Sequence, residues 1–281
     1  MFVLTKTVWG FFMKKLNLKN LNLSNLKIDL TKKENKINLV FGISLIVVII
    51  IAVVCAAVLG GGSSEINFHV SGDYAEGIDV SSHNGSIDWE TVADNTDFAI
   101  IRAGYRGYGE NGTLVQDEYF DENIEAATDA GVMVGVYFYS QATTVEEAEE
   151  EADFVLEILD GVDLDLPVFI DFEFPYDDDG VTPIGRMYSA GLSADGYTEL
   201  INAFCTKIED AGYYHGVYSS SNVYNIYLTV DDFIDGTYIW VADYNSTVSF
   251  MGEYDVLQYS KYGSCEGVNS SYVDVNRWYV D

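Results

Sequence analysis

Short apolar runs, rich in β-branched and aromatic residues and bounded by turn residues, recur along the chain from residue 76 onward. Runs of this length and composition are typical of β-strands. There are eight of them, at residues 76–81, 97–105, 132–140, 166–173, 214–220, 238–244, 255–260 and 273–278. The pattern therefore predicts a domain built on eight strands.

The intervals between these runs predict how the strands are connected. Three long early intervals, residues 117–131, 143–159 and 193–212, place apolar residues at the spacing of an amphipathic helix. A parallel crossover needs roughly ten to twelve residues or more. The last two intervals, residues 245–254 and 261–272, are barely that long and show no helical period. The sequence thus predicts an α/β fold, a TIM-like (β/α)5(β)3 barrel whose last strands are joined by loops or hairpins.

A different pattern precedes the strands. Residues 39–59 form an uncharged apolar run of about the 20 residues that a helix needs to cross a bilayer. The apolar region of a secretory signal peptide is shorter, at about 7–15 residues, so we interpret the run as a transmembrane helix. Lys32, Lys33 and Lys36 precede it and no basic residue follows it before Arg102, which predicts a cytoplasmic N-terminus by the positive-inside rule.

These patterns divide the chain into four parts. They are a basic cytoplasmic leader at residues 1–36, a transmembrane helix at 37–60, a flexible linker at 61–73 and an extracellular barrel domain at 74–281. The expected protein crosses the cell membrane once and contacts the membrane through its N-terminal helix.

Charge is distributed unevenly between these parts. The chain has a formal net charge of -31, and eight of its 14 Lys and Arg residues lie in the leader. The leader carries a formal charge of +6, and the remainder carries -37 with only six basic residues. Nucleic acid is excluded as a partner of this remainder, because its phosphates are normally held by clusters of Lys and Arg.

The sequence gives little sign of other chemistry. No metal-ligand spacing, phosphate-binding loop or nucleophile elbow occurs, so neither a metal nor a cofactor is expected, and no required protein partner is evident. Cys205 and Cys265 leave two interpretations open, one disulfide of an extracellular domain or two free thiols.

Four acidic residues lie inside apolar sequence at predicted strand ends. They are Asp171 and Glu173 in "VFIDFEFP", Asp79 in "GIDVSSH" and Asp274 in "YVDVNRW". Catalytic groups of such barrels lie at the carboxyl ends of the strands, although solvated acids at frayed strand ends are an alternative interpretation. Four carboxylates at one mouth would repel each other and raise at least one pKa, the condition for a general acid at neutral pH. Paired carboxylates in an aromatic-lined cleft indicate glycoside hydrolysis.

Motifs along the barrel carry a more specific signal. "GIDVSSHNG", "IIRAGY", "GVYFYS", "FIDFE", "WVADY", "LQYS" and "VDVN" follow one another in the order found in glycoside hydrolase family 25. Residues 74–281 therefore resemble these muramidases, or Chalaropsis-type lysozymes. The resemblance implies a (β/α)5(β)3 barrel that hydrolyses the β-1,4 bond between N-acetylmuramic acid and N-acetylglucosamine, with peptidoglycan glycan strands as its partner. The chain departs from the family pattern at Tyr137-Phe138-Tyr139 and at Leu257, which puts substrate preference in doubt.

The resemblance also implies roles for the acidic residues. Glu173 would be the general acid, and Asp171 would orient the 2-acetamido group of the substrate, whose carbonyl can act as internal nucleophile with net retention. Asp79 and Asp274 would maintain the charge pattern and position the sugar or Glu173. Further substrate-binding candidates lie at or near strand ends: Arg102, Tyr137, Tyr139, Tyr218, Trp240, Tyr244 and Gln258. Ordinary barrel packing explains the five aromatic residues equally well, and Gln258 could equally bond to backbone groups. Arg102 is expected to pair with one of the acids and to belong to the site.

Two other functions remain open from the sequence. One is a different retaining hexosaminidase, such as a chitinase. The other is a cell-wall-binding module that does not catalyse a reaction.

Overall fold

The structure is a computed structural model that describes residues 66–68, 70 and 72–280. The predicted leader, the predicted transmembrane helix and the first part of the predicted linker lie outside these residues. Within the described part of the chain, no helix is long and apolar enough to span a membrane.

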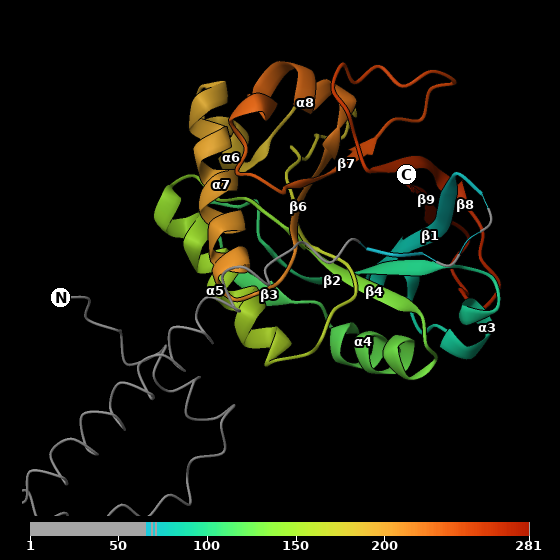
Figure 1. Cartoon of the computed structure of the whole chain (residues 1–281). Coiled ribbons are helices and arrows are strands. Elements are labelled where there is room, and N and C mark those ends of the chain that lie inside the picture. The colour runs from blue at the N-terminus through green and yellow to red at the C-terminus, as the bar shows by residue number, and fades with distance from the viewer. Residues whose placement is uncertain (1–65, 69, 71, 281) are drawn as a thin grey trace, which may run out of the picture. The chain divides into compact units, whose positions relative to one another are not determined.

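Eight strands close into a barrel (Figure 1). Around the ring the order is β1, β9, β8, β7, β6, β5, β4, β2 and back to β1. The short strand β3 pairs with the carboxyl-terminal end of β2. Apart from β3, the strands β1 through β8 pair in parallel, whereas β3 is antiparallel to β2 and β9 is antiparallel to both of its neighbours. The strands are β1 Tyr74–Val80, β2 Phe98–Arg106, β3 Leu114–Gln116, β4 Met133–Tyr139, β5 Val168–Asp171, β6 His215–Ser220, β7 Tyr238–Ala242, β8 Val256–Gly263 and β9 Val273–Tyr279.

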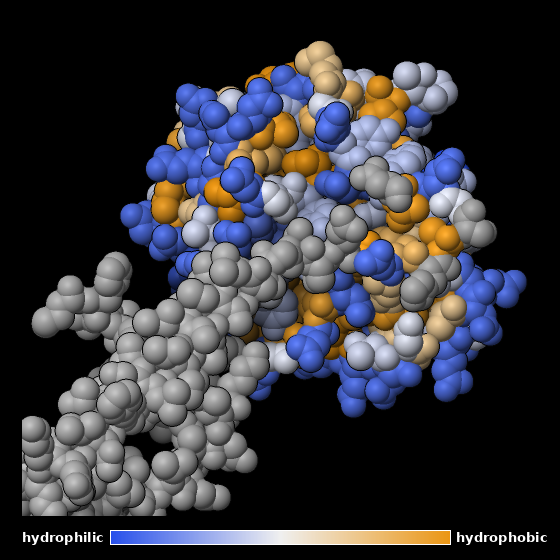
Figure 2. Space-filling view, viewed as in Figure 1, coloured by the Kyte–Doolittle hydropathy of each residue, from blue (hydrophilic) through white to orange (hydrophobic). Residues whose placement is uncertain are grey.

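Helices follow each of the first five parallel strands and cover the outside of the barrel (Figure 1). They are α3 Trp89–Ala93, α4 Phe120–Asp129, α5 Val145–Leu159, α6 Gly185–Ala190, α7 Ala194–Asp210 and α8 Ser221–Tyr227, with short 3-10 turns η3 Ser82–Asn84 and η4 Val230–Asp232. Figure 2 shows hydrophilic side chains over the outer helices on the face in view.

Local sequence explains where the long helices begin and end. The hydroxyls of Thr144 and Ser193 accept hydrogen bonds from backbone N–H groups in the first turns of α5 and α7, which satisfies donors that a helix cannot satisfy itself. Gly131 and Gly212 follow α4 and α7 with φ angles of 79° and 92°, as their position in the sequence predicts. In α4 and α7 the left-handed residue is the second after the helix, whereas in α5 it is the first, Asp160 with φ 40°.

The predicted (β/α)5(β)3 barrel is confirmed, with two differences in detail. The loop between β7 and β8 makes a parallel crossover without a helix, because these strands pair in parallel. The strand β3 was not predicted, since its three residues are too few to show an alternating pattern. It forms a short antiparallel extension of β2 beside the mouth of the barrel.

The apolar core has two layers. The larger one lies between the strands and the helices. The smaller one fills the barrel and consists of Ala75, Phe98, Ile100, Leu166, Phe169, Trp240, Val256 and Trp278. Ile66, Phe68 and Val70 pack against this inner layer, with the Phe68 ring 5.5 Å from those of both Phe98 and Trp278. These described residues of the predicted linker therefore contribute to the barrel core.

The structure resolves the two interpretations of the cysteines. Cys205 is buried on α7 and Cys265 lies half-buried after β8, and both are free thiols.

Candidate active site

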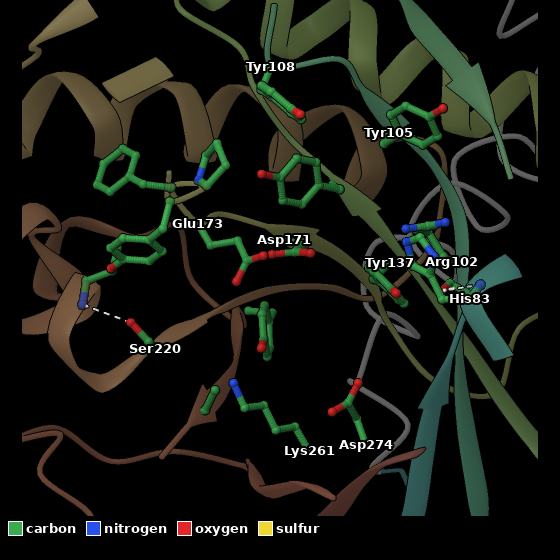
Figure 3. A pocket seen from close by; sticks show the side chains of 18 of the residues that line it. His83, Arg102, Tyr105, Tyr108, Tyr137, Asp171, Glu173, Ser220, Lys261 and Asp274 are labelled. Carbon is green, nitrogen blue, oxygen red and sulfur yellow. Dashed lines mark hydrogen bonds between the residues drawn. The ribbon is translucent and has the colours of Figure 1, made fainter. Parts of the chain in front are cut away.

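A cleft of about 1480 Å³ opens at the carboxyl ends of the parallel strands (Figure 3). It is lined by residues that end or follow β1, β2, β4, β5, β6 and β7, and by Lys261 and Asp274 from β8 and β9. The site is at this end because the strands run in parallel and their carboxyl ends meet there.

Asp171 and Glu173 enter the cleft from one wall. The strand β5 ends at Asp171, two residues before the end of the predicted run, and the Phe172 N–H still donates a hydrogen bond of 2.9 Å to the Tyr218 carbonyl. Phe172 is fully buried on the helix side, with its ring 5.3 Å from Tyr197. The residues on either side of it therefore point inward, and Figure 3 shows both carboxyl groups directed into the cleft.

Asp79 and Asp274 lie on the opposite side of the barrel as direct partners in the antiparallel β1–β9 pair. Asp79 is buried just beneath the cleft, and its Oδ2 accepts hydrogen bonds of 2.8 Å from the side-chain amides of Gln258 and Asn276. Asp274 is more exposed and lines the cleft. The register therefore places the two carboxyl groups beside each other on neighbouring strands.

The four carboxyl groups influence one another's ionisation. Burial, and then the charge of Asp274, raise the pKa of Asp79 to about 8. Burial and Asp274 likewise raise the pKa of Glu173 to about 7, while Lys261 opposes the shift. The pKa of Asp171 lies well above its usual range because of burial and the charges of Glu173 and Asp79. Burial also raises the pKa of Asp274. The structure thus gathers the acids that the sequence had placed at four separate positions.

Five of the seven predicted substrate-binding residues line the cleft. They are Arg102, Tyr137, Tyr139, Tyr218 and Tyr244. Their positions match the expectation that side chains at strand ends reach the mouth of a barrel.

Trp240 and Gln258 do not line the cleft, so the prediction that they contact substrate is corrected. Trp240 is 1% exposed and packs inside the barrel, with its ring centroid 4.5 Å from that of Tyr218. Gln258 is 3% exposed, and its carbonyl oxygen accepts hydrogen bonds from the hydroxyls of Tyr218 and Tyr244 at 2.9 and 2.7 Å. Its amide N–H group also donates to Asp79. Gln258 is therefore a buried residue that positions the side chains of Asp79, Tyr218 and Tyr244.

Arg102 pairs with an acid that the sequence did not indicate. Its guanidinium lies 2.7 Å from Asp117, which is buried directly after β3, and donates a hydrogen bond of 2.9 Å to the Ser82 hydroxyl. Its charge nevertheless opposes the rise in the pKa of Asp171. Arg102 therefore lines the wall of the cleft, and its positive charge favours the ionised form of Asp171.

Two functional candidates were missed. The side-chain amide of Gln141 donates a hydrogen bond of 3.1 Å to the backbone carbonyl of Glu173, and so holds the segment that carries the proposed acid. Lys261 lines the cleft beside Asp274. The sequence offered a signal for each, since Gln141 directly follows the third apolar run and Lys261 is the only Lys or Arg between Lys207 and Arg277.

The described residues include no group of three or more His, Cys, Asp or Glu side chains arranged to hold a metal ion. The cleft is lined by the carboxyl groups of Asp171, Glu173 and Asp274, with Asp79 just beneath it, and paired carboxyl groups are the catalytic groups of most glycoside hydrolases.

Comparisons with known proteins agree with this arrangement. The family model described as "Glycosyl hydrolases family 25" matches residues 78–268, and the chain belongs to this family. None of the curated protein sequences compared with the chain matched it.

Several solved structures share the fold. The modular autolysin LytC from Streptococcus pneumoniae, solved in complex with a synthetic peptidoglycan ligand, is 27% identical with a TM-score of 0.60; the match covers 73% of this chain and 47% of the autolysin. A family 25 glycosyl hydrolase from Bacillus anthracis is 24% identical, with a TM-score of 0.59 and coverage of 78% and 96%. The lysozyme from Streptomyces coelicolor is also 24% identical, with a TM-score of 0.59 and coverage of 73% and 91%. The chain thus spans about half of the modular autolysin.

Proposed function

We propose that this chain is a peptidoglycan hydrolase that cleaves the β-1,4 bond between N-acetylmuramic acid and N-acetylglucosamine. Family membership supports a glycosidase, and one structural relative binds a synthetic peptidoglycan ligand. The observation that carries the proposal is the placement of Glu173 and Asp171 in one cleft, with the pKa of both carboxyl groups raised.

Glu173 is the general acid of the proposed reaction. A pKa of about 7 leaves a substantial fraction of its carboxyl group protonated at neutral pH, so it can donate a proton to the departing glycosidic oxygen. As the bond to that oxygen breaks, the anomeric carbon gains positive charge and must be stabilised from its other side. After proton transfer the Glu173 carboxylate can accept a proton from the water that completes hydrolysis.

Asp171 is suited to assist the substrate's own acetamido group. Its Oδ1 is buried and has no hydrogen-bond partner among the described residues. An acetamido N–H placed there would supply the missing donor. Such a bond would direct the acetamido carbonyl toward the anomeric carbon, where it acts as internal nucleophile and gives net retention.

Asp79 and Asp274 set the electrostatics of the site. The charge of Asp274 is the largest contribution after burial to the raised pKa of Glu173. Asp79, fixed by two amide hydrogen bonds, adds negative potential under the cleft when it ionises. Asp274 therefore favours the protonated form of Glu173. Either residue, when ionised, favours a positively charged transition state.

Product analysis tests this function. The purified full chain is incubated with purified sacculi, and the new reducing ends are identified by mass spectrometry. We expect muramic acid ends from the wild type and from Glu125→Gln, an exposed control on α4, and none from Glu173→Gln. Glucosamine ends would indicate another specificity, wall binding without new ends would indicate a binding module, and full activity of Glu173→Gln would refute the role of Glu173.

We further propose that the enzyme is anchored in the cell membrane with its barrel domain outside. The apolar run at residues 39–59 and the lysines before it support this arrangement. An antibody against the barrel should bind intact spheroplasts, and the chain should remain in the membrane fraction after a high-salt wash. Recovery of the intact chain in the soluble fraction would refute the anchor.

A further inference from the structure

The described part of the chain has six Lys and Arg side chains, and five of them form ion pairs. The pairs are Arg102–Asp117, Arg106–Glu151, Arg186–Glu147, Lys207–Asp153 and Arg277–Glu76. Lys261 forms no ion pair with any described residue. In a domain with such an excess of acidic residues, a cation without a carboxylate partner is unusual.

This lysine lies in the cleft. Lys261 is exposed on β8, and Figure 3 shows its side chain reaching into the same hollow as Glu173 and Asp274. Its ammonium group lies 5.8 Å from the ring centroid of Tyr244 and 5.6 Å from that of Tyr262. The ring faces attract the cation without neutralising it, so its charge remains available to an anion.

The surroundings make that charge important for any anionic ligand. The positive charge of Lys261 acts on the carboxyl groups of Glu173 and Asp274, where it opposes the rise in the pKa of both. Each carboxyl group of the cleft that is ionised repels a negatively charged ligand, whereas a neutral sugar meets no such repulsion. An anionic group that binds here therefore needs a local cation, and Lys261 is a cation of the cleft that forms no ion pair with a described carboxylate.

We propose that Lys261 binds a carboxylate of the substrate and thereby favours glycans that carry carboxylates over neutral ones. This inference rests on the proposed peptidoglycan hydrolase function and narrows its substrate class. An ammonium–carboxylate contact is a charge-assisted hydrogen bond, which is stronger than a neutral one. In peptidoglycan the carboxylate can belong to the lactyl group of muramic acid or to the attached peptide, whereas a chitin oligosaccharide carries none.

Calorimetric binding tests the inference at neutral pH and low salt. The full chain carries Glu173→Gln throughout, so that the ligands are not hydrolysed. Three ligands are compared: peptide-bearing glycan strands, strands stripped of peptide so that the lactyl carboxylates are free, and a chitin oligosaccharide. The variants are Lys261→Met, the conservative Lys261→Arg, and Lys207→Met, a control with the same charge change at a lysine paired with Asp153 outside the cleft.

We expect Lys261→Met to weaken binding of at least one carboxylate ligand by about fivefold, which is the upper range for an exposed ion pair. Binding of the chitin oligosaccharide should change by less than about twofold, and added salt should diminish the difference between the ligands. Lys261→Arg should retain the preference, and Lys207→Met should bind all three ligands as the parent does. A loss with stripped strands assigns the lactyl carboxylate, and a loss confined to peptide-bearing strands assigns the peptide.

Two results would overturn the inference. Equal weakening for charged and neutral ligands would mean that Lys261 acts only through the acids of the cleft, and unchanged binding would mean that it contacts no carboxylate. Because binding is measured without turnover, its outcome is separate from that of the sacculus assay. An inactive wild type with Lys261-dependent carboxylate binding would refute the proposed hydrolysis and leave the recognition intact.

Discussion

The replacement Asp79→Asn isolates one buried carboxyl group and gives a measurable dependence of stability on pH. Asp79 is 6% exposed, and burial together with Asp274 raises its pKa from 3.8 to about 8. The folded protein therefore holds a proton that the unfolded chain has released at every pH between these values. Asparagine keeps an oxygen that can accept the hydrogen bonds from Gln258 and Asn276, and it does not titrate.

The sign and size follow from proton linkage. A carboxyl group whose pKa is raised on folding contributes stability that is complete below its unfolded pKa and is lost as the pH rises through its folded pKa. The loss is about 1.4 kcal/mol per pH unit for one proton. Between about pH 5 and about pH 8, the unfolding free energy of the wild type should fall relative to that of Asp79→Asn by about 4 kcal/mol.

Urea unfolding of the full chain at several pH values measures this difference. Tryptophan fluorescence reports on the domain, because Trp240 and Trp278 are buried inside the barrel and Trp89 is buried between the strands and the helices. Other titrating groups contribute to both proteins, so the quantity of interest is the gap between the two curves. Asp129→Asn, at the exposed end of α4, is the matched control and should follow the wild type. Parallel curves for Asp79→Asn and the wild type would refute the reasoning.

Three further predictions concern the acid and the network that supports it. The kcat on glycan strands should fall as the pH rises above about 7, because the acid form of Glu173 is lost there, and a kcat that stays constant through that range would contradict its role. Gln141→Leu should lower kcat by about tenfold with little change in KM, since the hydrogen bond to the Glu173 backbone is lost; steady-state kinetics that show an unchanged kcat would exclude this positioning role. Arg106→Met should reduce the unfolding free energy by about 3–5 kcal/mol in urea titrations, because Glu151 is fully buried and would lose its charged partner; a double variant with Glu151→Met should recover most of the loss, and failure to recover would contradict the explanation.

Family motifs made the acidic residues easy to find, whereas their supporting contacts could not be read from the sequence. "FIDFE" and "VDVN" mark strand ends, so Asp171, Glu173 and Asp274 were identified from local pattern alone. Arg102 was expected to pair with an acid, but its partner Asp117 follows a three-residue strand with no recognisable signal. Aromatic residues near strand ends were equally ambiguous, because side chains that alternate along a strand can face the cleft or the core.

Trp240 and Gln258 show why the ambiguity could not be resolved earlier. Both side chains point into the barrel from their strands, but they are buried below the residues that line the cleft. Depth along a barrel depends on the stagger between neighbouring strands, and the stagger is fixed by hydrogen-bond register across the whole ring. A single strand carries no information about that register.

The sequence by itself determined the strand and helix pattern, the order of the barrel units and the identity of the four acids, because each of these depends on the periodicity and composition of a short segment. Only the tertiary structure decided that Asp79 faces Asp274 across antiparallel strands, that Gln141 holds the backbone of Glu173, and that Lys261 keeps an unpaired charge in the cleft. Such relations join residues far apart in the chain. They arise from closure of the barrel, and burial then gives them their effect on pKa and charge.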